Sequence, residues 1–394
     1  MLGPDDLHDL TALRHALHAA PDLSGDEGPT AARLGAFLAP LGPAQLIEGL
    51  GGTGLAAVFE GAAPGPTLML RAELDALPIP ETNDVPHASR VPGRGHLCGH
   101  DGHMAILCAV ARVLARRPPL RGRVVLLFQP AEETGQGAAA VLADPRFAAL
   151  APDRVLALHN LPGLPLGHVG LVAGPMCCAS RGLEITLAGR TAHASMPETG
   201  RSPAGALARL IPALTALGTG HPAGGALAPG FRLATITHAA LGVPSFGISP
   251  GTARLMVTLR SLEDAGMARL CAEAEALIRA EAAADGLCPT LSWHDDFAAC
   301  TNDPGLIAEW RAPCAKAGLP VIEGLGPMRW SEDFGRFGAV APAALAILGA
   351  GETHPQLHNP DYDFPDALIA PGAALFLGAV AASLGLPEDD AGPA

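Results

Sequence analysis

A short stretch of this sequence gathers several side chains that can bind a metal ion or move a proton. Between residues 95 and 105 it contains His96, Cys98, His100, Asp101 and His103, followed by an apolar run. Thiolate and imidazole groups bind borderline transition metals well. Cys98 and His100 are two positions apart, so in an extended segment both side chains leave from the same face. A lone free cysteine is more often a buried apolar residue. Two ligands do not make a metal site, so the remaining ligands must come from other parts of the chain.

Other polar groups directly follow apolar stretches that we predict to be strands. α/β sheets carry their chemistry at the C-terminal ends of strands, so we expect these groups to share one site. The groups and the strands before them are Asp75 after 66–70, Glu132 and Glu133 after 123–128, and His159 after 154–158.

Each of these groups also has a simpler interpretation when it is taken alone. The two glutamates could lie in a solvated turn, and Asp75 could form a surface pair with Arg71. A histidine that closes an apolar strand is usually buried and hydrogen-bonded. If the glutamates lie in a non-helical turn, however, one carboxylate could bind a metal while its neighbour serves as a general base.

Strands and helices alternate along most of the chain, which predicts an α/β fold with parallel strand pairs. Helical spacing of apolar residues predicts helices at 5–20 and from residue 104 onward. From about residue 180 the order becomes β-α-β-β-α-β, which is typical of a ferredoxin-like unit. We therefore predict a catalytic domain in two parts, 1–178 and 293–394, with an inserted domain at 179–292.

Composition excludes several classes of protein. The chain has 394 residues, 49% of them hydrophobic, which is enough for more than one core. The formal net charge is −14 and there is no run of Lys or Arg, so nucleic acid and anionic membranes are not expected partners. Residues 367–386 are uncharged, but they are rich in Ala and Gly and lack flanking anchors. We predict a packed helix there, not a membrane span.

The N-terminal residues show no basic segment followed by an apolar one, so no signal peptide is expected. The eight cysteines show no disulfide-scaffold spacing. Reduced thiols and a cytoplasmic location are the prediction.

Several motifs follow one another along the chain, at 18–24, 71–78, 98–103, 129–133, His159, 191–195, 331–334 and 358–360. Their order and spacing are more specific than any single one of them. Together they resemble the co-catalytic metallopeptidase family of aminoacylases, hippurate hydrolases and indole-acetyl-amino-acid hydrolases.

The resemblance implies a mixed-sheet, zinc-peptidase-like catalytic domain with an inserted ferredoxin-like lid that also joins the subunits of a homodimer or higher homo-oligomer. It further implies two divalent transition-metal ions (Zn²⁺, Mn²⁺, Co²⁺ or Ni²⁺). Cys98 would take the place of a bridging aspartate found elsewhere in the superfamily. The implied metal ligands are Cys98, His100, Glu133, His159 and His358.

The resemblance also assigns roles to three further residues. Glu132 would be the general base and acid, and Asp75 would orient a ligand. His193, in the inserted domain, would stabilise the oxyanion in the site of its own or of the partner subunit.

The expected activity is hydrolysis of the amide bond of an N-acyl amino acid or a similar small conjugate. A dipeptidase or carboxypeptidase on the same scaffold, or a binding protein without turnover, are the alternatives. The chain departs from the family pattern at Glu73, where Asp is common, and at Leu97, where Ala is usual. It also departs at 243–250 in the lid.

Overall fold

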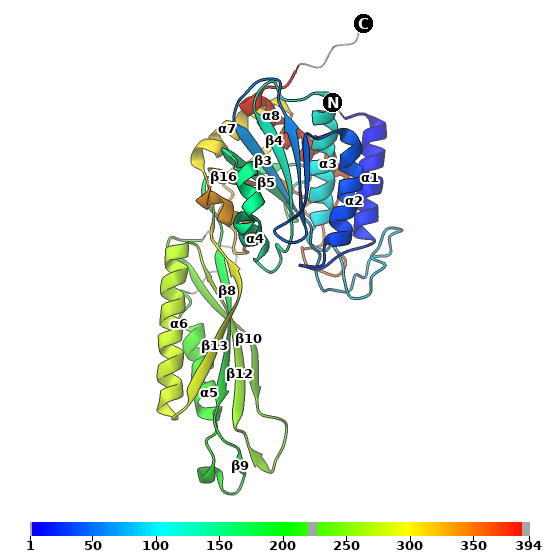
Figure 1. Cartoon of the computed structure of the whole chain (residues 1–394). Coiled ribbons are helices and arrows are strands. Elements are labelled where there is room, and N and C mark those ends of the chain that lie inside the picture. The colour runs from blue at the N-terminus through cyan, green and yellow to red at the C-terminus, as the bar shows by residue number, and fades with distance from the viewer. Residues whose placement is uncertain (1, 220–226, 388–394) are drawn as a thin grey trace. The chain divides into compact units, whose positions relative to one another are not determined.

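The structure is a computed structural model that describes residues 2–219 and 227–387 (Figure 1). The chain forms two compact units. The first comprises Met1–Met176, Thr301–Leu325 and Asp333–Ala394, and the second comprises Cys177–Cys300 and Gly326–Glu332.

The first unit is built on an eight-stranded sheet with the order β1-β2-β4-β3-β5-β16-β6-β15. Its central strands β4, β3, β5 and β16 run parallel, whereas β1, β2 and β6 are antiparallel to their neighbours β2, β4 and β16. The α/β fold with a mixed sheet, predicted from the sequence, is confirmed. The strands are β1 (Gln45–Leu50), β2 (Gly54–Glu60), β3 (Thr67–Glu73), β4 (Arg123–Gln129), β5 (Arg154–Leu161), β6 (Val169–Gly170), β15 (Val321–Ile322) and β16 (Ala343–Gly349).

Helices cover this sheet and share its hydrophobic core. Strands β3 and β16 are buried along their whole length, as expected for strands covered on both faces. Helix α3 packs against β3, α1 and α8. The helices of this unit are α1 (Pro4–His18), α2 (Gly28–Leu38), α3 (His100–Arg116), α4 (Gly137–Ala143), α7 (Pro304–Lys316) and α8 (Ile369–Leu384).

Helix α8 is the apolar segment at the end of the described chain. With the turn before it, Asp366–Leu384 is long and apolar enough to cross a membrane, but half of its most apolar window is buried within the protein. Leu375 and Phe376 lie in the core, and Gly372 brings the helix so close to α3 that an added Cβ would lie 2.4 Å from Ile106. Helix α8 is therefore packed as a core helix of the first unit.

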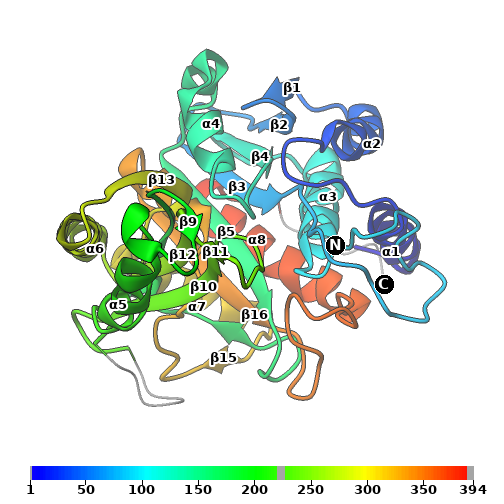
Figure 2. The same cartoon turned by 90° about the horizontal axis from the view of Figure 1, so that it is seen from below.

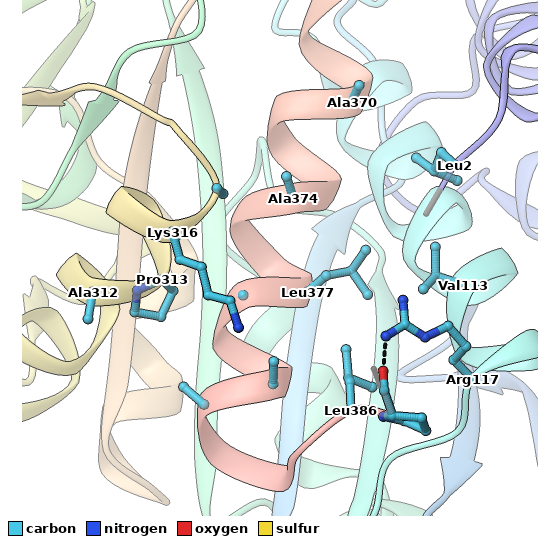
Figure 3. A pocket seen from close by; sticks show the side chains of 15 residues that line it. Leu2, Val113, Arg117, Ala312, Pro313, Lys316, Ala370, Ala374, Leu377 and Leu386 are labelled. Carbon is cyan, nitrogen blue, oxygen red and sulfur yellow. Dashed lines mark hydrogen bonds between the residues drawn. The ribbon is translucent and has the colours of Figure 1, made fainter. Parts of the chain in front are cut away.

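The outer side of α8 lines a groove of about 760 Å³ together with α7 and the end of α3 (Figure 3). Small residues of α8, among them Ala370, Ala374 and Gly378, line it. Lys316 and Arg117 lie on opposite sides, and Arg117 donates a hydrogen bond to the carbonyl of Pro387. Since this side of α8 lies in the groove, its apolar surface is only partly exposed.

The second unit is a four-stranded antiparallel sheet, ordered β10-β12-β8-β13, with α5 and α6 packed together against it (Figure 2). Residues alternate between buried and exposed along β8 and β12, and the buried ones share a core with both helices. This is the strand order of a ferredoxin-like unit. Its elements are β8 (Ala179–Ala188), α5 (Ala204–Thr215), β10 (Arg232–Leu241), β12 (Thr252–Ser261), α6 (Asp264–Ala284) and β13 (Cys288–Phe297).

The bounds of the second unit are wider than the predicted range 179–292. Strand β13 continues to Phe297, and the separate segment Gly326–Glu332 joins the unit. Four short strands complete the structure: β9 (Ala192–His193) pairs with β11 (Ile248–Ser249), and β7 (Gly174–Cys177) pairs with β14 (Cys300–Asn302).

Candidate metal centre

The polar residues singled out in the first unit meet at one edge of its sheet. Strands β4, β3 and β5 are parallel neighbours, so their C-terminal ends lie together. Asp75 follows β3, Glu132 and Glu133 follow β4, and His159 lies near the end of β5. All four side chains are buried or nearly so.

Cys98 and His100 reach the same place through a tight turn and not through an extended segment. His100 is the first residue of α3, and Gly99 before it has a left-handed backbone with φ of 92°. A Cβ on Gly99 would lie 2.4 Å from the Asn160 side chain, so only glycine fits here. The predicted extended geometry for this pair is therefore wrong, although both side chains still face the same cluster.

Two groups of three possible ligands share the thiol of Cys98. One consists of Cys98, His100 and His159, and the other of Cys98, Glu133 and His358; within each group the ligand atoms lie within 4.8 Å of one another. Cys98 Sγ is 3.5 Å from His159 Nε2, and Glu133 Oε1 is 3.8 Å from His100 Nε2 and 3.7 Å from His358 Nε2. Four other possible ligands, from four different segments of the chain, thus lie around the sulfur of Cys98.

Backbone carbonyls fix the orientation of two imidazoles. His100 Nδ1 is 2.8 Å from the Asp75 carbonyl, and His159 Nδ1 is 2.7 Å from the Asn160 carbonyl. A carbonyl only accepts, so each Nδ1 carries a proton, and Nε2 is the ring nitrogen left for the centre. In the described chain, the buried Nε2 of His100 has no hydrogen-bond partner.

Electrostatics at the centre favour a cation. Burial opposes the charged form of His100, but Asp75, Glu73 and Glu133 outweigh it and raise its pKa to about 10. Burial lowers the pKa of His159 to about 3, so this ring is neutral and available as a ligand. A thiol, three imidazoles and a carboxylate are donors that suit a divalent transition metal, so the residues present fit the metals that the resemblance implies.

Glu132 lies beside the ligand groups. Its Oε2 is 4.0 Å from His100 Nε2, and its Oε1 accepts a hydrogen bond of 3.4 Å from the Asp333 backbone. Three described non-glycine residues have positive φ, and two of them belong to this region: Ala131 (49°) and His358 (65°). Such backbone strain is common at functional sites.

A buried polar network behind the centre was not predicted from the sequence. The Arg71 guanidinium, for which a surface pair with Asp75 was one alternative, is buried and bonds Glu73, Gln129 and Asp333. The network continues from Glu73 through His103 to Asn160, whose amide bonds the hydroxyl of the chain's single tyrosine, Tyr362. These residues hold the ends of β3, β4 and β5 in fixed positions.

A second buried cluster connects α1 to the start of α3. Arg14 and His18 on α1 both contact Asp101, the residue after His100, at 3.3 Å and 2.8 Å. His18 also contacts Glu81 at 3.1 Å and lies 3.9 Å from Asp363, with the rings of His87 and His96 nearby. Burial disfavours the His18 charge, but Asp101 and Glu81 outweigh it and raise the pKa of His18 to about 10.

This cluster should make the protein less stable at alkaline pH. The pKa of folded His18 is above its ordinary value of 6.5, so its stabilising charge is fully present below about pH 6.5 and is lost as the pH rises through about 10. We expect the difference in free energy of unfolding between wild type and His18→Gln to shrink over this interval, as measured by urea denaturation. The exposed His8 on the same helix provides a matched histidine-to-glutamine control. A constant difference between wild type and His18→Gln would contradict the assignment.

His193 lies in the second unit. It belongs to β9, opposite Ile248, and its exposed side chain has Nδ1 at 2.7 Å from the Ser195 hydroxyl. The structure therefore places seven of the eight predicted site residues in the first unit, while the role of His193 stays a prediction.

Comparison with known proteins identifies the class to which this fold and cluster belong. Residues 69–382 match the model of peptidase family M20/M25/M40. The chain belongs to this family, which confirms the resemblance and the hydrolase class predicted from the sequence.

Individual relatives are similar over nearly the whole chain. The N-acetyl-L-cysteine deacetylase of Bacillus subtilis is 32% identical over 91% of this chain and 84% of its own length. The hippurate hydrolase of Campylobacter jejuni is 30% identical over 92% and 94%. Among solved structures, the Bacillus subtilis YXEP protein, a dinuclear metal-binding peptidase from the M20 family, has a TM-score of 0.80 at 24% identity, covering 97% of this chain and 99% of its own.

Proposed function

We propose that this protein hydrolyses the amide bond of N-acyl amino acids with two divalent transition-metal ions. The observation that carries the proposal is the position of the Cys98 thiol within both groups of three ligands. The ions would be held by Cys98, His100, Glu133, His159 and His358. The deacetylase and hippurate hydrolase relatives support the substrate class.

The residues around the centre divide the chemistry between them. The bound ions would polarise the scissile carbonyl and lower the pKa of a water molecule. Glu132 would take a proton from the attacking water and deliver it to the leaving amine. Asp75 accepts a hydrogen bond of 2.9 Å from the Glu133 backbone N–H, and its own backbone carbonyl orients His100. It would therefore fix the geometry of two ligands.

An assay for release of free amine tests this proposal. Protein stripped with a chelator is reloaded with one metal at a time and incubated with a panel of N-acyl amino acids and dipeptides. Activity is expected with Mn²⁺, Zn²⁺, Co²⁺ or Ni²⁺, because thiolate is too soft a ligand for Mg²⁺. Turnover of dipeptides alone, or full activity with Mg²⁺, would refute the proposal.

His193 is proposed to stabilise the negative charge that develops on the carbonyl oxygen. If it contacts only the transition state, His193→Ala should lower kcat by about 100-fold or more with little change in KM. Metal content should not change, since His193 is not a proposed ligand. Steady-state kinetics with elemental analysis measures both quantities, and unchanged kinetics would remove His193 from the mechanism.

We also propose a cytoplasmic homodimer joined through the second unit. The eight cysteines, all among the described residues, are free thiols. The loop after β10 exposes Val243 (76%) and Phe246 (106%) to solvent.

If His193 acts in the partner's site, a mixture of inactive His193→Ala and Glu132→Gln proteins should regain activity after subunit exchange.

A further inference from the structure

Glu27 is a buried carboxylate to which neither the resemblance nor the metal cluster assigns a role. It precedes α2, and its exposed fraction is 0%. Oε2 accepts a hydrogen bond of 2.6 Å from the Thr53 hydroxyl, and Oε1 accepts one of 2.7 Å from the backbone N–H of Ala131. The second contact matters because Ala131 directly precedes Glu132.

A second buried carboxylate holds the other side of Glu132 in the same way. Asp75 Oδ2 accepts a hydrogen bond of 2.9 Å from the Glu133 N–H and one of 2.6 Å from the Ser24 hydroxyl. Each carboxylate thus binds one backbone N–H and one hydroxyl. The residues before and after Glu132 are therefore both fixed. The turn that contains Ser24 and Glu27 takes part in both contacts, since Ser24 binds Asp75 and Glu27 is itself the other carboxylate.

The backbone between β4 and α4 needs such support. Ala131 adopts a left-handed conformation with φ of 49°, which costs a non-glycine residue about 1–3 kcal/mol. Its carbonyl accepts the N–H of Gly137 at 3.0 Å, and a Cβ on Gly137 would lie 1.5 Å from the Pro130 carbonyl. The carbonyl of Ala131 is thus already bound within the loop. Its N–H is the group through which Glu27 fixes the direction of the backbone that leads to Glu132.

We infer that Glu27 is a positioning residue that aims the Glu132 carboxylate at the reaction centre by holding the N–H of Ala131. The inference rests on the proposed role of Glu132 as the general base. The length of the Glu27 side chain matters here, because it brings an acceptor oxygen to the Ala131 N–H; the negative charge does not. Asp75 holds Glu133 independently of Glu27. Loss of the Glu27 side chain should therefore disturb the position of Glu132 more than the binding of the metal ions.

Three substitutions of Glu27 distinguish the effect of its side-chain length from the effect of its charge. Glu27→Gln keeps an acceptor oxygen at the same reach and removes the charge, so kcat should stay within about threefold of wild type. Glu27→Asp keeps the charge but is one methylene shorter. Glu27→Met keeps the volume without an acceptor. Both should lower kcat by ~10- to 100-fold with KM nearly unchanged, as is usual when a supporting group misplaces a reacting one.

Two further measurements distinguish positioning from general loss of structure. The metal content of each variant should equal that of wild type by elemental analysis. Hydrogen exchange of the segment 130–135 should accelerate in Glu27→Asp but not in Glu27→Gln. Asp22→Ala is the matched control, because Asp22 lies in the same turn but its side chain bonds Thr30 and not the loop; its kcat should be unchanged.

Two patterns would overturn the inference. Wild-type kcat in Glu27→Asp with a large loss in Glu27→Gln would show that charge matters and not reach. A loss of metal parallel to the loss of kcat would show that Glu27 supports the ligands. If Glu27→Met fails to fold, the comparison of Glu27→Gln with Glu27→Asp still distinguishes side-chain length from charge. If wild-type protein hydrolyses no N-acyl amino acid, the proposed function fails independently, and hydrogen exchange alone then decides whether Glu27 holds the loop.

Discussion

Replacing Glu132 by glutamine is expected to reduce kcat by ~10²- to 10⁴-fold while both metals stay bound. The amide has nearly the shape of the carboxylate and can keep the hydrogen bond from the Asp333 backbone, but it cannot accept the proton of the attacking water. Glu132 lies 4.0 Å from His100 Nε2 and belongs to neither group of three that shares Cys98. Its removal should therefore spare the metals.

The neighbouring glutamate supplies the comparison for this experiment. Glu133→Gln should instead lower metal occupancy, because Glu133 Oε1 lies within 3.8 Å of two histidine nitrogens. Elemental analysis after dialysis, together with the kinetics of fully loaded protein, separates the two effects. If Glu132→Gln empties the site and Glu133→Gln does not, the two roles must be exchanged.

Replacing Cys98 by alanine should empty the centre more completely than replacing any of the other ligands. Its sulfur is the one atom common to both groups of three, so its loss leaves each ion with fewer and harder donors. We expect less than about one ion per chain after dialysis and no measurable turnover. Cys98→Asp should recover part of the metal, because a carboxylate can also bridge two ions.

Cys108 is the matched control for Cys98. It is buried on α3 in the same unit, and burial raises the pKa of its thiol well above the ordinary value, so it stays a neutral apolar group. Cys108→Ala should lower stability by a small amount and leave the metal content at the wild-type value. Equal metal content in Cys98→Ala and wild type would refute the proposed ligand set.

Patterns of polarity along the chain were sufficient to predict which side chains meet at the C-terminal ends of the parallel strands. Asp75, Glu133 and His159 each follow or close an apolar strand, and parallel neighbours bring such ends together. The β-α-β-β-α-β order of the second unit could also be predicted, and buried residues recur at every second position over much of β8 and β12. These predictions depended on local periodicity, which a sequence displays directly.

Other features depended on contacts that periodicity does not reveal. The extended geometry expected at Cys98 fails because Gly99 turns the chain in a left-handed conformation. Arg71 could not be distinguished from a surface arginine, since its partner Asp333 lies 262 positions away. Glu27 reaches a backbone N–H more than one hundred positions later. Nothing near these residues in sequence signals such partners.

The topology of the sheet has a consequence for how the chain is made. Strand β5, which carries His159, pairs on one side with β3 and on the other with β16, whose residues 343–349 follow the whole second unit. During synthesis the β5 edge therefore stays unpaired until those residues leave the ribosome, and an apolar open edge is prone to aggregation. His358, a proposed metal ligand, is made later still, so the proposed ligand set would be complete only after the residues of β16 have been made. Folding of this enzyme should thus depend on chaperones that shield β5 while the second unit is being translated.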